Sequence, residues 1–335
     1  MSASTSTPFH DGLPVLAGGA APTCAGLDAM RIISAAGDDA LAFLHGQLTQ
    51  DVTGQPVDRA SLAGYCTAKG RLLATLVMWR AWTEPAEPTD ARWHALVRAD
   101  LAEALVKRLS MFVLRAKARL SVSATLHAFG VQASAEHVAA LQSAAGGALP
   151  DQPWLRADLP TGTWIAAPSA DGPRWWWIAS DAQLQAGQDL ARLLGRGDTQ
   201  DWQVADLAAG LPWIASLTQD LFIPQTVNLE LAGGVSFTKG CYPGQEVVAR
   251  SHYRGTVKRR MAYGRLQETG TIAQPGVDVY DAKDAHEPTG RVVDAAGDAL
   301  LFETTLASLP EGDLRLGSAD GPRIRVLPLP YALSA

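Results

Sequence analysis

The segment FIPQTVNLELAGGVSFTKGCYPGQEVVARSHYRG (222–255) contains the rarest residue types of the chain. It holds the only asparagine, Asn228, and one of the three cysteines, Cys241. Two glycines and a proline flank Cys241, and this pattern predicts a tight loop that carries the thiol near its tip. A thiol in such a loop is a candidate nucleophile or metal ligand. The alternative is a glycine–proline turn in which Cys241 packs as a small hydrophobic residue.

Side chains next to Cys241 favour the reactive interpretation. Lys239 lies two residues upstream and, with nearby backbone N–H groups, favours the thiolate over the thiol. Gln245 and Glu246 supply a neutral amide and a carboxylate within reach of anything held at the loop. Cys241, Lys239, Gln245 and Glu246 are therefore the candidate catalytic residues.

A cluster of positive charge follows this loop. Five cations occur within eleven residues, with no acidic residue among them: Arg250, Arg254, Lys258, Arg259 and Arg260. On a chain with a net charge of −6, such a cluster suits carboxylates or phosphates. The alternative is a solvated strand pair with its linker. An RNA surface is a weaker interpretation, because no known RNA-binding module accompanies the cluster.

Two earlier strings also combine polar groups with turns. FLHGQLTQDV (43–52) ends an apolar helix with hydrogen-bonding side chains, and CTAKGRLLA (66–74) places two cations on a hairpin turn. The side chains concerned are Gln47, Gln50, Asp51, Lys69 and Arg71. The alternatives are a polar helix end that faces water and a turn kept soluble by its charge.

Composition excludes several classes of protein. The 335 residues, 47% hydrophobic and 19% charged, describe a globular protein of about two domains or three small ones. Three scattered cysteines without a CxxC pair exclude a disulfide framework, a zinc ribbon and a self-contained four-cysteine cluster. The sequence contains no phosphate-loop, GxGxxG, HExxH or GxSxG motif. It also shows no signal peptide and no apolar stretch of about 18 residues, so the expected location is the cytoplasm.

The hydrophobic pattern predicts the elements that position these residues. Expected strands are 30–36, a hairpin over 65–82 with its turn at Lys69–Gly70, 92–98, 121–131 and 175–180. Four helices are expected. One follows Asp38, one begins at a D-x-x-E capping box at 100–103, and the other two span 134–144 and 181–197. Three consecutive tryptophans, Trp175 to Trp177, alternate between the two faces of their strand and suit a core. Short strands from 255 to 329 predict a small β-sandwich or barrel after two α+β units.

The octapeptide KGCYPGQE (239–246) closely resembles the signature of the YgfZ family. So do its flanks FIPQTVNLELAGG and VVARSHYRG and, in the same order, FLHGQLTQDV, YCTAKGRLLA and the terminal LPLPYALS. The resemblance runs from Leu27 to Leu333. It implies an α+β, multi-domain, ring-like architecture of the glycine-cleavage T-protein type, with a small C-terminal β-barrel. The implied domains are a folate-binding α+β core (23–120 plus 200–250), a second α+β domain (121–199) and the C-terminal β-barrel domain (251–335).

The same resemblance implies a function. Members of the family bind tetrahydrofolate or a derivative and support the assembly or repair of iron–sulfur clusters in client enzymes, including those that thiolate tRNA. Cys241 matches the cysteine on which that activity depends, and it becomes a candidate transient cluster ligand, with no resident metal expected. The implied partners are iron–sulfur client enzymes or assembly proteins, without a membrane or direct nucleic-acid contact. Candidate folate contacts are Gln47, Asp51, Lys69, Arg71, Trp202, Asn228, Arg250 and Arg254.

Two alternative functions remain open. The first is a tetrahydrofolate-dependent aminomethyl or one-carbon transferase, since the family is related to aminomethyltransferases. That enzyme family carries a catalytic aspartate with no clear counterpart in RADLAEALVKRL (98–109), and Ala208 stands where its pterin-holding glutamate is expected. An accessory factor is therefore favoured over an enzyme. The second alternative is an RNA- or protein-binding adaptor that uses the cations of 250–260.

Overall fold

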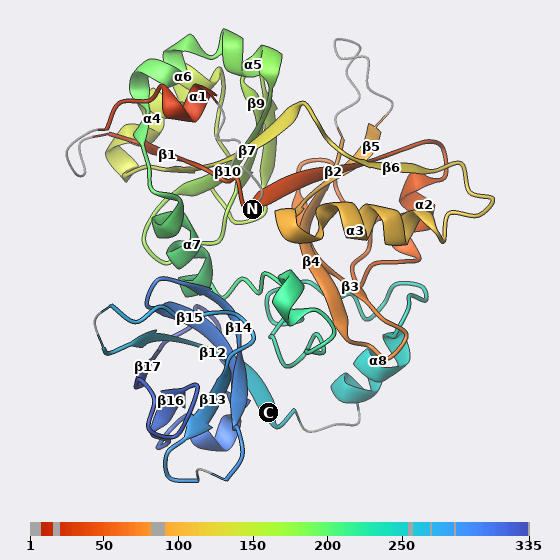
Figure 1. Ribbon diagram of the computed structural model, residues 1–335. Helices are drawn as coiled ribbons and strands as arrows, with labels where there is room; N and C mark the ends of the chain where they lie inside the picture. Colours follow the sequence, from red (N-terminus) through yellow and green to blue (C-terminus); the bar gives the residue numbers. More distant parts are fainter. Residues whose placement is uncertain are drawn as a thin grey trace. The chain divides into compact units, whose positions relative to one another are not determined.

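A computed structural model describes residues 8–15, 21–81, 91–253, 257–268, 270–284 and 286–333. Helices are interspersed among the strands along the chain, and the strands form three β-sheets (Figure 1). The chain divides into two compact units. Unit 1 comprises Met1–Phe43, Gly54–Ser61 and Val77–Trp202, and unit 2 comprises Leu44–Thr53, Leu62–Leu76 and Gln203–Ala335. No helix among the described residues is long and apolar enough to cross a membrane.

A six-stranded sheet in unit 1 has the order β11-β1-β7-β10-β9-β8. Its strands are β1 (Thr23–Gly26), β7 (Leu126–Gln132), β8 (Arg156–Leu159), β9 (Gly162–Ala166), β10 (Arg174–Ser180) and β11 (Gly195–Arg196). The short helix α1 (Pro8–Asp11) lies beside β1. Helices α4 (Val138–Ala145), α5 (Asp181–Ala186) and α6 (Gln188–Leu193) bury their leucines against one face of the sheet (Figure 1). This face forms one hydrophobic cluster of the unit 1 core.

The tryptophans of β10 alternate between faces, as predicted. Trp175 and Trp177 point into the core, where Trp177 stacks on Trp164 with ring centroids 5.2 Å apart. Trp176 lies in the opposite direction, with its ring 5.8 Å from that of Trp154 and 6.4 Å from that of Trp202. Consecutive strand residues must separate in this way, so the three rings serve packing on two faces of one sheet.

A five-stranded sheet has the order β3-β4-β5-β2-β6. Its strands are β2 (Met30–Ala36), β3 (Ala60–Cys66), β4 (Leu72–Arg80), β5 (Ala91–Arg98) and β6 (Arg119–Val122). Helix α2 (Ala40–His45) follows β2, and α3 (Ala99–Ser110) packs against β2, β5 and β6 (Figure 1). The predicted hairpin is confirmed as β3 and β4, with its turn at Lys69–Gly70.

The start of α3 differs from the prediction. Leu101, Leu105 and Leu109 are buried along one side of the helix, and Phe112 lies beyond its last residue and is half exposed. The capping box at 100–103 is wrong, since Arg98 is the N-cap and no side chain caps the helix. The N–H of Ala99 instead donates to the carbonyl of Ala29 at 2.8 Å, so the helix continues directly from β5.

Three other predicted elements are interrupted. The strand expected over 121–131 is two strands, β6 and β7, because Ser123 Oγ accepts a hydrogen bond from the N–H of Leu126 and turns the chain. The helix expected over 181–197 is two helices that break at Gly187. Helix α2 ends at His45 and does not reach Leu48, which is buried beyond it.

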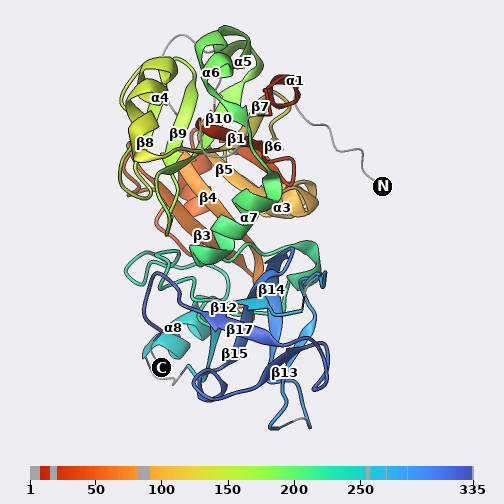
Figure 2. The same ribbon diagram turned by 90° about the vertical axis from the view of Figure 1, so that its left-hand side faces the viewer.

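The C-terminal sheet in unit 2 has the order β16-β13-β14-β15-β12-β17 (Figure 2). Its strands are β12 (Arg259–Leu266), β13 (Asp278–Asp281), β14 (Gly290–Ala296), β15 (Ala299–Thr305), β16 (Leu314–Leu316) and β17 (Ile324–Leu327). A bridge between Arg315 of β16 and Arg323, directly before β17, brings the two edges of the sheet together and almost closes it as a barrel. The predicted barrel is confirmed, although β15 was not among the expected strands.

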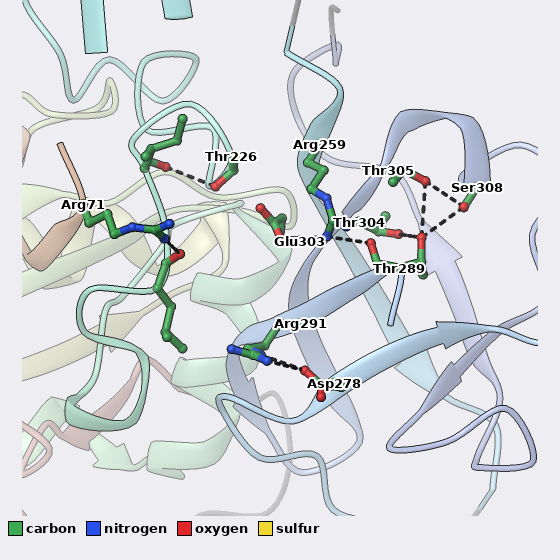
Figure 3. Close-up of polar contacts among 12 residues, drawn as sticks. Arg71, Thr226, Arg259, Asp278, Thr289, Arg291, Glu303, Thr304, Thr305 and Ser308 are labelled. Carbon is green, nitrogen blue, oxygen red and sulfur yellow. Dashed lines mark hydrogen bonds and ion pairs between the residues drawn. The ribbon is translucent and has the colours of Figure 1, made fainter. Parts of the chain in front are cut away.

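Hydroxyl groups tie β14, β15 and the following 3-10 turn (Leu306–Ser308) together at one edge of this barrel. Thr289 Oγ1 lies 3.3 Å from Thr305 Oγ1 and 3.2 Å from Ser308 Oγ (Figure 3). Arg259 donates to the Thr289 carbonyl at 3.0 Å and pairs with Glu303 at 3.4 Å (Figure 3). These contacts satisfy polar groups where β12 enters the sheet.

Candidate functional site

Cys241 lies in a loop of unit 2 directly before helix α8 (Gln245–Tyr253). Its side chain is exposed, whereas Cys24 and Cys66 are buried. Burial raises the pKa of the Cys24 thiol and raises that of Cys66 to about 12. Of the three thiols, Cys241 is therefore the one that reagents and partners can reach. Tyr242 points the other way, is buried, and anchors the loop.

Two glycines dock the loop on the β3–β4 turn. Gly244 has φ 80°, and a Cβ on it would lie 2.4 Å from the Thr67 carbonyl oxygen and 2.6 Å from Gly70 Cα. Gly70, with φ 72°, would place a Cβ 2.9 Å from Val247 Cβ. Left-handed backbone and this close approach both require glycine. The strings CTAKGRLLA and KGCYPGQE are therefore in direct contact.

Lys239 connects the loop to the end of α2. Its Nζ donates to the carbonyl of His45 and, at 2.6 Å, to that of Leu48. It also lies 5.0 Å from the centroid of the Tyr242 ring. Burial lowers the pKa of Lys239 to about 8, while the charges of Asp51 and Cys241 oppose that shift. The charge of Cys241 thus acts on the Lys239 ammonium, which two carbonyls hold in position. That Lys239 favours the Cys241 thiolate stays a prediction.

The rest of the string 43–52 packs on the glycines that precede the loop. Thr49 Oγ1 donates to the Gly234 carbonyl at 2.6 Å and accepts from the Gly64 N–H at 2.7 Å. Gln50 Nε2 donates to the Gly233 carbonyl at 2.5 Å. Gln47 is half-buried on the same segment. Thr49, which was not a candidate, and Gln50, which was singled out in the sequence, thus hold two distant segments together.

His45 was not among the candidate residues, yet it faces the loop. Its Nδ1 lies 3.1 Å from Asp51 Oδ1 and 3.1 Å from Thr53 Oγ1. Its Nε2 lies 3.7 Å from the position that a Cβ on Gly240 would occupy. The available signal was a histidine at the predicted end of a polar-tipped helix, but nothing local linked it to Cys241.

Asn228 lies fully buried under the barrel strand β12. It has φ 57°, which asparagine tolerates better than most residues. Its Nδ2 donates to the Met261 carbonyl at 2.7 Å, and its Oδ1 accepts from the Met261 N–H at 3.3 Å. Tyr331 lies 3.5 Å from the same amide, and burial raises the pKa of Tyr331 to about 12. These contacts make Asn228 a structural link within unit 2.

The predicted cluster of five exposed cations is wrong in one member. Arg260 is buried, where it pairs with Glu230 at 2.5 Å and donates to the Gln225 carbonyl at 2.9 Å. It serves packing beneath the Asn228 segment and contributes no surface charge. Arg254 lies outside the described residues.

The remaining candidates differ in accessibility. Arg71 donates to the Leu221 carbonyl at 2.5 Å (Figure 3), and Lys69 is exposed on the same turn. On α8, Gln245 is half-buried and Glu246 pairs with Arg250 at 3.2 Å on the surface. Trp202 belongs to unit 1 and is buried, with the Arg174 guanidinium 4.5 Å from its ring centroid. Among the described residues, no group of three His, Cys, Asp or Glu side chains could hold a metal ion.

Comparison with known proteins decides the family. No family model matches the chain. A protein of Edwardsiella ictaluri named tRNA-modifying protein YgfZ is 34% identical over 337 residues, which cover 97% of both chains. The protein of that name from Pectobacterium carotovorum is 28% identical and covers 98% of this chain and 97% of its own. The chain belongs to the YgfZ family.

A solved structure supports the fold of this YgfZ-family chain. The crystal structure of glycine cleavage system aminomethyltransferase T from Bartonella henselae matches with a TM-score of 0.68 and 16% identity. The match covers 97% of this chain and 88% of that one. The predicted family and the T-protein-type α+β fold are both confirmed.

Proposed function

We propose that this chain is a folate-binding accessory factor for the assembly or repair of iron–sulfur clusters in client enzymes, including tRNA-thiolating ones. Relatives that match nearly full length carry the name tRNA-modifying protein, which supports a role in tRNA modification. The exposure of Cys241, on a loop fixed from two sides, is the observation that carries the proposal. The expected partners are iron–sulfur client enzymes or their assembly proteins.

The chemistry of the loop supports a transient role for Cys241. A single thiolate cannot hold an iron–sulfur cluster, so the client or an assembly protein supplies the other ligands. In this proposal the Lys239 ammonium, held by two carbonyls beside the loop, favours the thiolate form that binds iron or attacks sulfur. Gln245 and Glu246, at the start of α8, remain candidates for contacts with the group held at the loop.

The described side chains fit folate only in part. Lys69 and Arg250 are exposed cations that suit the glutamate carboxylates of a folate tail. In contrast, Asn228 donates its amide to Met261 and Trp202 is covered by Arg174. The proposal of folate therefore rests on the family and the fold, and no chemical step is derived through it.

The second candidate is a tetrahydrofolate-dependent aminomethyl or one-carbon transferase, favoured by the fold of the Bartonella henselae aminomethyltransferase. Such a reaction needs a base close to the substrate amine. Ala208 stands where the glutamate of that enzyme family is expected, and its catalytic aspartate has no clear counterpart in the segment 98–109. This makes the accessory role the better supported of the two.

Genetic complementation tests the proposal. A strain that lacks its own YgfZ-family protein receives wild type, Cys241→Ser or the control Cys24→Ala, and thiolated tRNA bases are measured. We expect rescue by wild type and by Cys24→Ala, which alters only a buried thiol of unit 1. Cys241→Ser should fail. Equal rescue by Cys241→Ser would make the cysteine structural, and failure of well-expressed wild type would favour the transferase.

A further inference from the structure

We propose that His45, held by Asp51, is the proton partner of the Cys241 thiol. Cys241, His45 and Asp51 have the residue types of a nucleophile, its base and the carboxylate that orients the base. The pair of His45 and Asp51 is in place, and the His45 ring faces Gly240, the residue before Cys241. This inference rests on the proposed reactive role of Cys241, and it extends that role to residues almost 200 positions earlier in the chain.

The first observation is that Asp51 and Thr53 hold the His45 ring in one orientation. His45 Nδ1 faces Asp51 Oδ1 at 3.1 Å, and Thr53 Oγ1 lies 3.2 Å from the same carboxylate oxygen and 3.1 Å from the same ring nitrogen. Two partners on Nδ1 fix the ring and leave Nε2 as the nitrogen that exchanges a proton with a second group.

The second observation is that His45 Nε2 faces the cysteine loop. It lies 3.7 Å from the Cβ position of Gly240, the residue bonded to Cys241. Because Gly240 has no side chain, nothing of that residue covers the ring on this side. The His45 side chain is 22% exposed, so the nitrogen is sheltered but reachable.

Lys239 does not compete for this role. Its ammonium donates to the carbonyls of His45 and Leu48, and a group that donates to two carbonyls does not accept the thiol proton. The same two bonds tie the backbone of His45 to the loop. Lys239 thus supplies the fixed positive charge, and His45 supplies the exchangeable proton site.

The other charges around the loop come from its neighbouring elements. They are Asp51 on the 45–53 segment, Lys69 and Arg71 on the β3–β4 turn, and Glu246 and Arg250 on α8. Tyr242 and Cys66 face inward, where burial raises the pKa of both groups and keeps them neutral. Two histidines, His45 and His252 on α8, are of the residue type that ordinarily changes charge between pH 5 and 8. Burial also lowers the pKa of Lys239 to about 8.

The proposed step is a proton transfer. The S–H bond of Cys241 breaks, its proton bonds to His45 Nε2, and its electron pair stays on sulfur. The products are a thiolate and an imidazolium, so charge and atoms balance. The imidazolium returns the proton when the sulfur is released from its partner.

Alkylation of Cys241 by iodoacetamide tests this inference without a client or folate. Thiolate is the reacting form, and buried Cys24 and Cys66 add little background. The rate is measured from pH 5 to 10 for wild type, His45→Gln and the control His252→Gln, whose ring stacks on Phe237 with centroids 3.8 Å apart. Cys241→Ser gives the background.

We expect His45→Gln to lower the rate at pH 7 by about three- to tenfold and to move the pH midpoint upward, since one pH unit changes the thiolate fraction about tenfold. His252→Gln should follow wild type. Proton NMR adds a reciprocal readout, because Cys241→Ser must then shift the titration of the His45 ring.

Identical alkylation profiles for wild type and His45→Gln, with both proteins folded by circular dichroism, would overturn the inference. So would an unchanged His45 titration in Cys241→Ser. Either result leaves the complementation outcome untouched, because that experiment tests the need for the sulfur and this one tests its proton partner.

Discussion

Gly244→Ala should destabilise unit 2 by about 2–5 kcal/mol. The left-handed φ of 80° accounts for about 1–2 kcal/mol of this, because alanine resists that conformation. The new Cβ, 2.4 Å from the Thr67 carbonyl oxygen and 2.6 Å from Gly70 Cα, adds about 1–3 kcal/mol of overpacking. Both contacts are with backbone, so no side chain can rotate away.

Two other glycines separate these contributions. Gly233 has φ 78° with nothing within 4 Å of an added Cβ, so Gly233→Ala carries the backbone strain alone. Gly240 has no left-handed φ, and its Cβ would meet only His45 Nε2 at 3.7 Å. We therefore expect about 1 kcal/mol for Gly233→Ala and under about 1 kcal/mol for Gly240→Ala.

Urea unfolding followed by circular dichroism measures the three variants against wild type, with iodoacetamide alkylation of Cys241 as a local probe. The Gly244→Ala variant should also alter the alkylation rate, because its loop must leave the β3–β4 turn. If Gly244→Ala were no more destabilising than Gly233→Ala, the contact between Gly70 and Gly244 would not be what seats the cysteine loop.

The remaining predictions concern buried polar groups. Burial lowers the pKa of His94 from its usual 6.5 to about 4. The folded state therefore resists protonation of this ring, and the free energy of unfolding of unit 1 should be highest above pH 6.5 and fall by about 3 kcal/mol towards pH 4. His94→Phe should flatten this part of a stability–pH curve, and an unchanged slope would contradict the assignment. Glu230→Gln should destabilise unit 2 by about 3–5 kcal/mol, because it removes the carboxylate that pairs with the buried Arg260 guanidinium. Urea unfolding of Glu230→Gln and of the double variant with Arg260→Met should show recovery in the double variant; a double variant as unstable as the single one would refute this reasoning.

The hydrophobic pattern predicted elements wherever local sequence alone determines them. The hairpin of β3 and β4 and the alternation of Trp175, Trp176 and Trp177 follow from period-2 patterning, and both are confirmed. The predicted capping box at 100–103 is wrong because the helix already begins at Ala99. The backbone N–H of Ala99 donates to the carbonyl of Ala29, and no side chain caps the helix. A contact with a residue 70 positions away leaves no local signal.

The site shows the same division between local and distant information. The exposed thiol of Cys241 and the nearby charge of Lys239 were predictable, because glycines, proline and lysine lie beside the cysteine. The buried position of Arg260 was not predictable. An arginine in a charged segment is expected on the surface, and its partners, Glu230 and the Gln225 carbonyl, lie 30 to 35 positions earlier in the chain. The proposed domain boundaries and folate contacts stay predictions.

The contact between the segments 43–52 and 239–246 depends on backbone carbonyls that accept hydrogen bonds from Lys239. A helix that ends at His45 leaves its last carbonyls without intrahelical donors. Lys239 satisfies that of His45 and also the carbonyl of Leu48, which lies beyond the helix, and its positive charge suits the negative end of a helix dipole. The bond that ends α2 therefore brings both the ammonium and the His45 ring to the cysteine loop. If so, Lys239→Met should disturb Cys241 reactivity more than His45→Gln does, because it removes the charge and releases the segment that carries the base.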